Sequence, residues 1–391
     1  MAWARRLPCG AAGVQMIGGQ GHDVVGVQLS FSPLERALTL VGLAPAVLLG
    51  AGIHQAATDG RQLPSPSYRS VMAVPAAAPQ VSAPAALRRN IEALRASFPG
   101  LAGISVRSVD DGWSVDSRDA GRRMPQQSVS KLWVTLTVLD AIDRGDLSLD
   151  TPVTLTRADL TLFHQPIAAM LKNGAYTTTV RELMQRAMTM SDNTCNDKLL
   201  NLVGGPAAVR EFIADHGLQD IKFGPGERLL QAGTAGLTWR QDMAMGRAFE
   251  AARARLPMGV RQSAFDSYIA NPPDGASASG ITFALAQLKR GMLLSPASTS
   301  YLIATMESAR TGKARMRGAV PPGWHFGHKT GTGQNLLSRV AGYNDVGLLT
   351  APDGRSYAIA IMIGDTTRPI PERQALMQAV VTNVVATHQY R

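Results

Sequence analysis

The sequence has little cysteine and no long basic run. Its 391 residues include two cysteines, Cys9 and Cys195. Two are too few for a disulfide framework or a cysteine zinc site, so small disulfide-stabilised scaffolds and zinc fingers are excluded. The formal net charge is +10, but residues 1–83 hold five basic and three acidic residues, so +8 is spread over the remainder. Such a diffuse positive charge favours small anionic substrates, and we expect no nucleic-acid partner.

The apolar run at 37–53 is too short for a typical membrane-spanning helix. That uncharged run has 17 residues, whereas a spanning helix needs about 20. Its length suits the hydrophobic part of a signal peptide, so we predict a leader over 1–61 and export to the periplasm. Because the run starts 36 residues in, either the true start lies further along, at Met16 or beyond, or the run is an uncleaved anchor. A buried core helix is the third interpretation, and Pro45 argues against it.

A linker rich in Pro, Ala and Ser follows at 62–84, and regular patterns begin at residue 85. The patterns predict helices at 85–98, 128–143, 180–190, 206–216 and 372–388, a hairpin at 103–117, and strands at 325–333, 339–351 and 356–365. Strands near both ends with helices between them predict an α+β domain over 85–391. We expect a sheet built from both termini, an inserted all-helical lobe at about 124–309, and a cleft between the two lobes.

Three short motifs stand in order along this domain. They are Ser128-x-x-Lys131 at a predicted helix start, Ser191-Asp192-Asn193 after a helix, and Lys329-Thr330-Gly331 on a strand. A serine hydroxyl is a weak nucleophile until a base takes its proton. A lysine one helical turn away can do so when its surroundings favour the neutral amine. The helix N-terminus also places the Ser128 N–H where it could hold an oxyanion.

The other two motifs supply groups that could grip a substrate. A Lys-Thr-Gly strand offers a cation, a hydroxyl and a glycine, Gly331, that allows close approach of a substrate backbone. Ser191 adds a second hydroxyl for proton transfer, and Asn193 an amide that could hold an acyl side chain. Each motif alone occurs by chance in many chains, so the functional prediction depends on the presence of all three together.

The trio in this order is the set found in class A β-lactamases and penicillin-binding proteins. The segments MSDNTCNDKLLNLVGGP, LLSPASTSYLIATM and RMRGAVPPGWHFGHKTGTG, with the APDGR turn, extend the match. The chain resembles class A serine β-lactamases over roughly residues 85–391. The resemblance implies a two-lobe fold with an antiparallel sheet, and hydrolysis of β-lactam antibiotics, hence antibiotic resistance, through a serine acyl-enzyme. It further implies a monomer whose partner is a small-molecule β-lactam, with no cofactor and no metal.

The resemblance also implies a role for each motif residue. Ser128 would be acylated, Lys131 would accept or relay its proton, and Ser191 would pass a proton to the departing lactam nitrogen. Asn193 would hold the acyl amide. The substrate carboxylate would be bound by Lys329 and Thr330, and the N–H groups of Ser128 and Thr332 would form the oxyanion hole.

By the same resemblance, the base for deacylation is Glu227. It lies 36 residues after Ser191, where the family has a glutamate, but Gln231 replaces the asparagine that usually helps to hold the water. The stretch at 239–280 is longer than is usual in the family, and its Asp266 and Asp274 are less well placed for the role. The alternative interpretation is that Glu227 is a solvated loop carboxylate.

Further candidates come from positions that the family uses around the cleft. Arg315 and Arg339 compete to clamp the substrate carboxylate, since Arg binds carboxylates bidentately, and we favour Arg315. An aromatic gatekeeper is expected at His164 or at Phe163 beside it. For three further residues we predict structural roles. His325 and His328 lack a third metal ligand, so we expect them to pack on the strand. We expect Cys195 to be a buried free thiol.

Four functions compete. The leading prediction is a periplasmic β-lactamase, with acylation of Ser128 followed by hydrolysis at Glu227. A penicillin-binding D-Ala-D-Ala peptidase would share the motifs without a matched deacylating glutamate. An esterase on the same scaffold is a weaker alternative. A lactam sensor that stays acylated would need the run at 37–53 to be an anchor joined to a signalling partner. Turnover separates the enzyme from the sensor.

Overall fold

The computed structural model describes residues 81–171 and 173–390. These residues belong to one compact unit, residues 74–391. The predicted leader at 1–61, its apolar run and the linker up to residue 80 lie outside the described residues. Within the described ranges, no helix combines the length and apolar character needed to cross a membrane.

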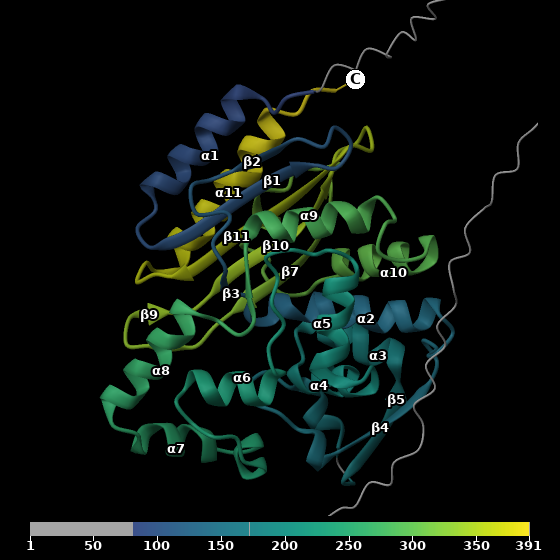
Figure 1. Ribbon diagram of the computed structural model, residues 1–391, viewed down its shortest axis with the longest axis vertical. Coiled ribbons are helices and arrows are strands. Elements are labelled where there is room, and N and C mark those ends of the chain that lie inside the picture. Colours follow the sequence, from purple (N-terminus) through teal and green to yellow (C-terminus); the bar gives the residue numbers. More distant parts are fainter. Residues whose placement is uncertain (1–80, 172, 391) are drawn as a thin grey trace, which may run out of the picture. The chain divides into compact units, whose positions relative to one another are not determined.

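A five-stranded antiparallel sheet joins the two ends of the described part of the chain. Its strand order is β2-β1-β11-β10-β7, so β1, from the start of the domain, pairs with β11, the last strand (Figure 1). This confirms the predicted α+β class with a sheet built from both termini. The strands are β1 (Leu101–Ser108), β2 (Ser114–Asp116), β3 (Met124–Pro125), β4 (Pro152–Thr156), β5 (Ala175–Thr179), β6 (Gly275–Ala276), β7 (His325–Thr332), β8 (Asn335–Leu336), β9 (Arg339–Val340), β10 (Tyr343–Thr350) and β11 (Ser356–Asp365).

Helices surround this sheet and form a second lobe beside it. They are α1 (Ala85–Ser97), α2 (Lys131–Asp143), α3 (Val180–Gln185), α4 (Asn193–Leu202), α5 (Gly205–Asp215), α6 (Glu227–Thr234), α7 (Ala248–Arg255), α8 (Met258–Ala270), α9 (Ala278–Lys289), α10 (Pro296–Glu307) and α11 (Ile370–Ala386), with shorter turns between them. Figure 1 shows α1 and α11 together on one side of the sheet and α9 on the other.

Alternation along β11 explains why both faces of the sheet are covered. Successive side chains of a strand point to opposite faces. Ile359, Ile361 and Ile363 pack with α1 and α11 in an outer core. Ala358, Ala360 and Met362 pack into the inner core, which continues through α9 into the helical lobe. Since every residue from Ser356 to Gly364 is buried, the strand reads as a continuous apolar run.

The helical lobe is built around α2. The predicted stripe of Leu132, Leu136 and Leu139 is buried, but so are all the remaining residues from Lys131 to Leu139. The helix therefore runs through the lobe instead of lying on its surface, which holds Lys131 away from water. The lobe also contains a β4–β5 ladder, so it is not all-helical. Two helices near the predicted end of the lobe pack against the sheet: α9 contacts β1, β10 and β11, and α10 contacts β7.

Two segments differ from their predicted form. The strand expected at 339–351 is divided into β9 and β10, with Gly342 between them at φ +102°. A Cβ atom at Gly342 would lie 2.9 Å from Gln127 Cγ, so this glycine lets the strand pass close to the start of α2. The long stretch after α6 folds into two helices, α7 and α8.

Candidate active site

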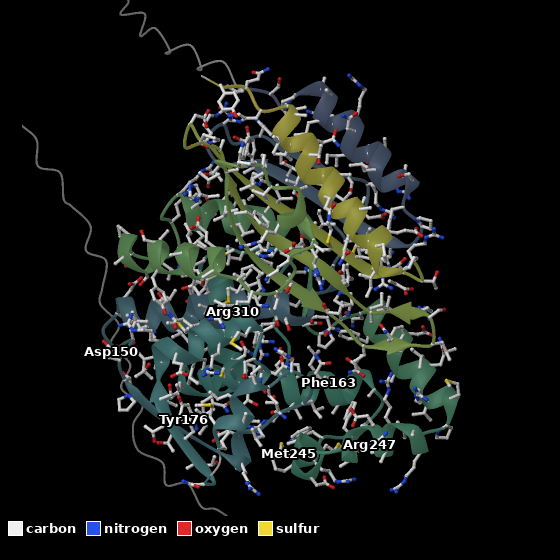
Figure 2. The ribbon with its side chains drawn as sticks, turned by 180° about the vertical axis from the view of Figure 1, so that it is seen from behind. Asp150, Phe163, Tyr176, Met245, Arg247 and Arg310 are labelled. Atoms are coloured by element: carbon white, nitrogen blue, oxygen red, sulfur yellow. The ribbon has the colours of Figure 1, made fainter. Side chains whose placement is uncertain are left out.

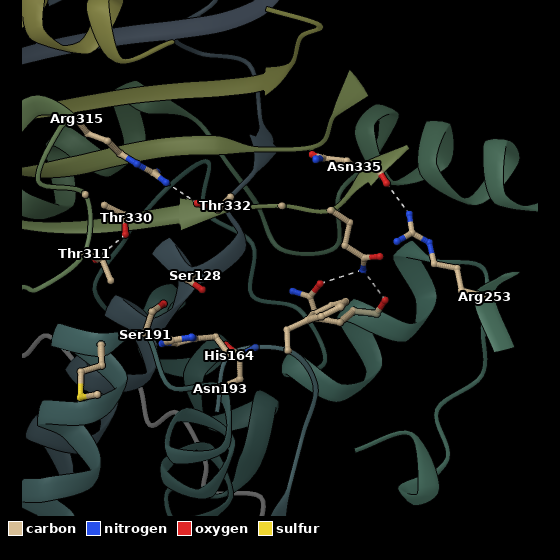
Figure 3. A pocket seen from close by; sticks show the side chains of 16 residues that line it. Ser128, His164, Ser191, Asn193, Arg253, Thr311, Arg315, Thr330, Thr332 and Asn335 are labelled. Carbon is tan, nitrogen blue, oxygen red and sulfur yellow. Dashed lines mark hydrogen bonds between the residues drawn. The ribbon is translucent and has the colours of Figure 1, made fainter. Parts of the chain in front are cut away.

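A pocket of about 700 Å³ lies where the helical lobe meets the edge strand β7. All three motifs contribute to its wall, as Figure 3 shows for Ser128, Ser191, Asn193, Thr330 and Thr332. The fold thus brings together groups that are about 60 to 200 residues apart in the sequence. The complete lining is Ser128, Phe163, His164, Met190, Ser191, Asn193, Gln231, Arg253, Thr311, Gly312, Arg315, Thr330, Thr332, Gly333, Gln334 and Asn335.

Lys131 connects the candidate nucleophile to the candidate base. Ser128 lies in a short 3₁₀ turn, Gln127–Ser130, that leads directly into α2. The fully buried Lys131 Nζ donates to Ser128 Oγ at 3.0 Å and to Asn193 Oδ1 at 2.9 Å. It also forms an ion pair with Glu227. The solvated-carboxylate interpretation of Glu227 is wrong, because its side chain is only 3% exposed and is held by Lys131.

A buried carboxylate beneath α6 fixes the backbone that carries Glu227. Asp197 Oδ1 accepts from Glu227 N at 2.9 Å, and its Oδ2 accepts from Arg228 N at 3.3 Å. These are free N–H groups of the first helical turn, where an acceptor stabilises the helix. Burial, with the nearby charge of Glu227, raises the pKa of Asp197 to about 6. The carboxylate therefore positions Glu227 at an electrostatic cost.

Gln231 lies one helical turn after Glu227 and faces the same site. Its Nε2 donates to Glu227 Oε2 at 3.3 Å and to Gln127 Oε1 at 3.2 Å. Gln334 Nε2 donates in turn to Gln231 Oε1 at 3.1 Å. Gln231, where the resemblance implied an asparagine, thus places an amide beside Glu227, and it also connects α6 to the segment after β7.

The Ser191-Asp192-Asn193 turn is shaped by its backbone. Ser191 has φ +62° at the end of a π-helical turn, and the Asp192 side chain caps α4 by accepting from Cys195 N at 3.0 Å. Asn193 Nδ2 donates to Leu162 O at 2.9 Å. The Asn193 side chain is therefore held on both sides, by Leu162 and by Lys131. Ser191 Oγ accepts from Lys329 Nζ at 3.0 Å.

Strand β7 presents the Lys-Thr-Gly motif to the pocket. Burial, together with the positive charge of Lys131, lowers the pKa of Lys329 well below its ordinary value. Thr330 Oγ1 lies 2.9 Å from Thr311 Oγ1. A Cβ atom at Gly331 would lie 2.3 Å from Gln126 O, so a glycine is required where the strand passes the turn before α2.

The two candidate arginines have different surroundings. The Arg315 guanidinium lines the pocket, donating to Gly331 O at 2.9 Å and to Thr332 Oγ1 at 2.5 Å, and it stacks on the Tyr343 ring at 3.8 Å. Arg339 lies on β9, is not among the residues that line the pocket, and pairs with Asp266 at 2.7 Å and Asp365 at 2.8 Å. These carboxylates raise the pKa of Arg339. Arg315 is thus the arginine that the fold brings to the motifs.

The remaining candidates occupy both rim and core positions. His164 lines the pocket, and its carbonyl accepts from Asn193 N at 2.9 Å. Phe163 also lines it, with φ +60°, and meets Phe249 of α7 edge-on at 5.1 Å; Figure 2 shows Phe163 on the same side of the lobe as Met245 and Arg247. His328 is buried, with Nδ1 2.7 Å from Asp345 Oδ1. Cys195 is a buried free thiol, and burial raises its pKa.

Several residues of the site carried no sequence signal. Asp197 stands in the helix after Asn193 and resembles any polar helical residue until the fold brings it under Glu227. Gln127 has φ +54° beside Ser128, and its conformation cannot be read from its residue type. Asp274, which the sequence offered only as a less well placed base, holds the turn before Ser128: it accepts from Gln127 N at 2.8 Å and from Tyr268 Oη at 3.1 Å. Arg253 reaches the pocket from α7, within the long stretch at 239–280.

Comparison with known proteins gives a consistent result. A family model described as the β-lactamase enzyme family matches residues 86–387. The extended-spectrum β-lactamase PER-1 of Pseudomonas aeruginosa is 26% identical over 75% of this chain and 84% of its own length. The β-lactamase VEB-1 of Pseudomonas aeruginosa is 27% identical over 62% of this chain and 70% of its own. A solved β-lactamase from Chitinophaga pinensis superposes with a TM-score of 0.62 at 25% identity, covering 76% of this chain and 97% of that one.

Proposed function

The chain belongs to the β-lactamase enzyme family and is a class A serine hydrolase of β-lactams, for which we propose a catalytic cycle through Ser128, Lys131 and Glu227. One observation carries this assignment of roles. Lys131 Nζ contacts both Ser128 Oγ and Glu227. The nucleophile and the base therefore share one buried lysine, which can pass protons between them.

In the acylation half of the cycle, the Ser128 hydroxyl loses its proton and attacks the lactam carbonyl. Lys131 transfers a proton to Glu227, and the neutral amine then accepts the proton of Ser128. The N–H groups of Ser128 and Thr332 stabilise the developing oxyanion. Ser191, hydrogen-bonded to Lys329, gives its proton to the lactam nitrogen as the C–N bond breaks and takes a proton from Lys131. Glu227 then returns its proton to Lys131, so the acyl-enzyme again holds a charged lysine and an ionised glutamate.

In the deacylation half, Glu227 removes a proton from a water that attacks the Ser128 ester. Gln231 donates to Glu227 and orients this carboxylate. Asn193 holds the acyl amide, while Lys329, Thr330 and Arg315 bind the ring carboxylate and His164 borders the acyl side. The C–O bond of the ester then breaks, and Ser128 regains its proton through Lys131. A matched base within reach of the nucleophile favours turnover over the peptidase and the non-turnover sensor.

The test is turnover of a chromogenic cephalosporin by residues 81–391, together with the intact mass of the protein. We expect multiple turnovers by the unchanged domain and no lasting adduct. Glu227→Gln keeps the size of the side chain but removes its basicity. It should accumulate an adduct of substrate mass on Ser128, with deacylation slowed at least about 100-fold. Ser128→Ala should give neither adduct nor turnover.

The opposite pattern would overturn the assignment. A stoichiometric adduct on the unchanged domain without turnover would identify a penicillin-binding peptidase or a sensor. Undiminished turnover by Ser128→Ala would exclude the serine mechanism. Glu227→Gln with normal turnover would exclude Glu227 as the base and leave Ser128 in place.

Export to the periplasm is also proposed. The support is the apolar run at 37–53 and the linker that follows it, and β-lactam antibiotics act outside the cytoplasmic membrane. The catalytic domain is proposed to act as a monomer, with the leader as its one contact with the membrane. Fractionation of cells carrying the full chain, with and without residues 37–53, tests this location.

A further inference from the structure

The pocket has a cationic residue at each end. Arg315 contacts Thr332, and Arg253 contacts Asn335. Figure 3 shows the two arginines on opposite sides of the drawn group, with Ser128 and Ser191 between them. The proposed function occupies only one of them, since Arg315 joins Lys329 and Thr330 in binding the ring carboxylate.

Arg253 comes from α7, in the long stretch after α6, and its guanidinium is incompletely used. Its Nη2 donates to Asn335 O at 2.5 Å. Its buried Nε has no hydrogen-bond partner among the described residues, and none of the carboxylates described there forms an ion pair with it. Arginine has five N–H donors arranged to bind a carboxylate bidentately. A half-buried guanidinium with spare donors at a pocket wall is suited to an anion.

A second arginine strengthens the positive field at this end. Arg261 of α8 also has a buried Nε without a partner in the part of the chain that the structure describes. Burial, with the charge of Arg261, lowers the pKa of Arg253, and the charge of Glu250 opposes this shift. Glu250 is exposed on α7. Because the two guanidinium groups repel each other, an anion beside Arg253 would relieve the repulsion.

The orientation of the substrate determines which anion can reach Arg253. The ring carboxylate of a β-lactam lies on one side of the reacting bond and the acylamino substituent on the other. With the carboxylate at Arg315 and the acyl amide at Asn193, the substituent would extend away from Arg315, toward the side of the pocket that Arg253 and Asn335 line. We propose that Arg253 binds an anionic group on the acyl side chain, so that the enzyme prefers β-lactams carrying a second carboxylate. This inference rests on the proposed function.

The test compares benzylpenicillin with its α-carboxy analogue, a matched pair that differs by one carboxylate on the acyl side chain. The measured quantity is the ratio of kcat/KM for the α-carboxy compound to kcat/KM for benzylpenicillin. In Arg253→Gln we expect this ratio to fall about tenfold through a higher KM for the carboxylated substrate, the size of one charge-assisted hydrogen bond. Arg253→Lys retains the charge and should keep most of the ratio.

The matched control is Arg255→Gln, on the same helix. Arg255 is exposed and does not line the pocket, so the ratio should stay unchanged. The preference of the unchanged enzyme should also weaken as salt is raised, because ionic screening acts on the second carboxylate.

Two results would overturn the inference and leave β-lactam hydrolysis standing. In one, Arg253→Gln hydrolyses both substrates with the kcat/KM values of the unchanged enzyme. In the other, kcat/KM falls equally for both substrates, which would assign Arg253 to support of Asn335 instead. Hydrolysis of neither substrate by the unchanged enzyme would overturn the proposed function as well.

Discussion

At the residue scale, the site depends on placing like and unlike charges in one buried volume. Lys131 and Lys329 are both fully buried, and one carboxylate, Glu227, pairs with Lys131. Among the described residues, Lys329 forms no ion pair, so a bound ring carboxylate would supply one. Binding of the ring carboxylate therefore neutralises charge as well as filling the pocket, which explains why a buried lysine is useful there.

The rise of KM at alkaline pH (the alkaline limb of the pH profile) should reflect the loss of charge on Lys329. Burial and the charge of Lys131 lower its pKa well below 10.5, so its amine loses charge at a lower pH than an ordinary lysine. KM for a β-lactam with a ring carboxylate should therefore rise as pH increases through that lowered pKa. Lys329→Arg keeps the cation charged, because arginine does not deprotonate in this range. The limb should move to higher pH in this variant.

The measurement is kcat and KM between pH 6 and about 10, with Lys198→Arg as the control. Lys198 pairs with Asp159 at 3.0 Å and does not line the pocket, so its replacement should leave the limb in place. A limb that appears in kcat, with KM constant, would exclude Lys329 as its source.

At the element scale, local sequence patterns predicted most helices and strands, whereas the roles of several site residues depend on contacts between elements. Strand β11 falls on the predicted residues because its apolar run and flanking turn are local signals. Lys131 was predicted from its spacing to Ser128. Asp197 and Arg253 could not be predicted, because their roles depend on which backbone or pocket each one meets after folding. The all-round burial of α2 had no local signal either, since a helical stripe predicts only one buried face.

The stability of the protein should depend on pH through Asp274, which joins the segment between α8 and β6 to the turn before Ser128. Burial raises the pKa of Asp274 from 3.8 to about 7. The folded protein therefore keeps this proton up to about pH 7, whereas the unfolded chain releases it near pH 4. Folded molecules bind more protons in this window, so their stability falls as pH rises from about 4 to 7.

Asp274→Asn should remove this contribution, since an amide does not titrate and still accepts from Gln127 N and Tyr268 Oη. Chemical unfolding at pH 4.5 and pH 8 measures the effect. The free energy of unfolding of the variant, relative to the unchanged protein, should increase by a few kcal/mol, as an order of magnitude, between these pH values. Asp266→Asn, on the exposed surface of α8, is the control. A difference that stays constant or decreases with pH would contradict the assignment.

At the scale of the whole molecule, the sheet separates a structural core from the catalytic one. The outer core contains α1 and α11 residues packed on one face of the sheet. The inner core continues into the helical lobe that carries Ser128 and Lys131. None of the residues in the outer core lines the pocket. The strand pairing of β1 with β11 was predictable as a sheet drawn from both ends, but the division into two cores follows from packing.

This division predicts that stability can be lowered without loss of catalysis. Ile91 of α1 is fully buried in the outer core. Ile91→Ala should lower the free energy of unfolding by about 2–5 kcal/mol, because it removes buried methyl groups and leaves a cavity. Arg89→Ala, on the exposed side of the same helix, should change it by less than about 0.5 kcal/mol. For both variants we expect kcat/KM per folded molecule to match the unchanged enzyme, measured at a temperature where each is folded. A large loss of kcat/KM in Ile91→Ala with the fold intact would mean that α1 and the pocket are coupled through the sheet.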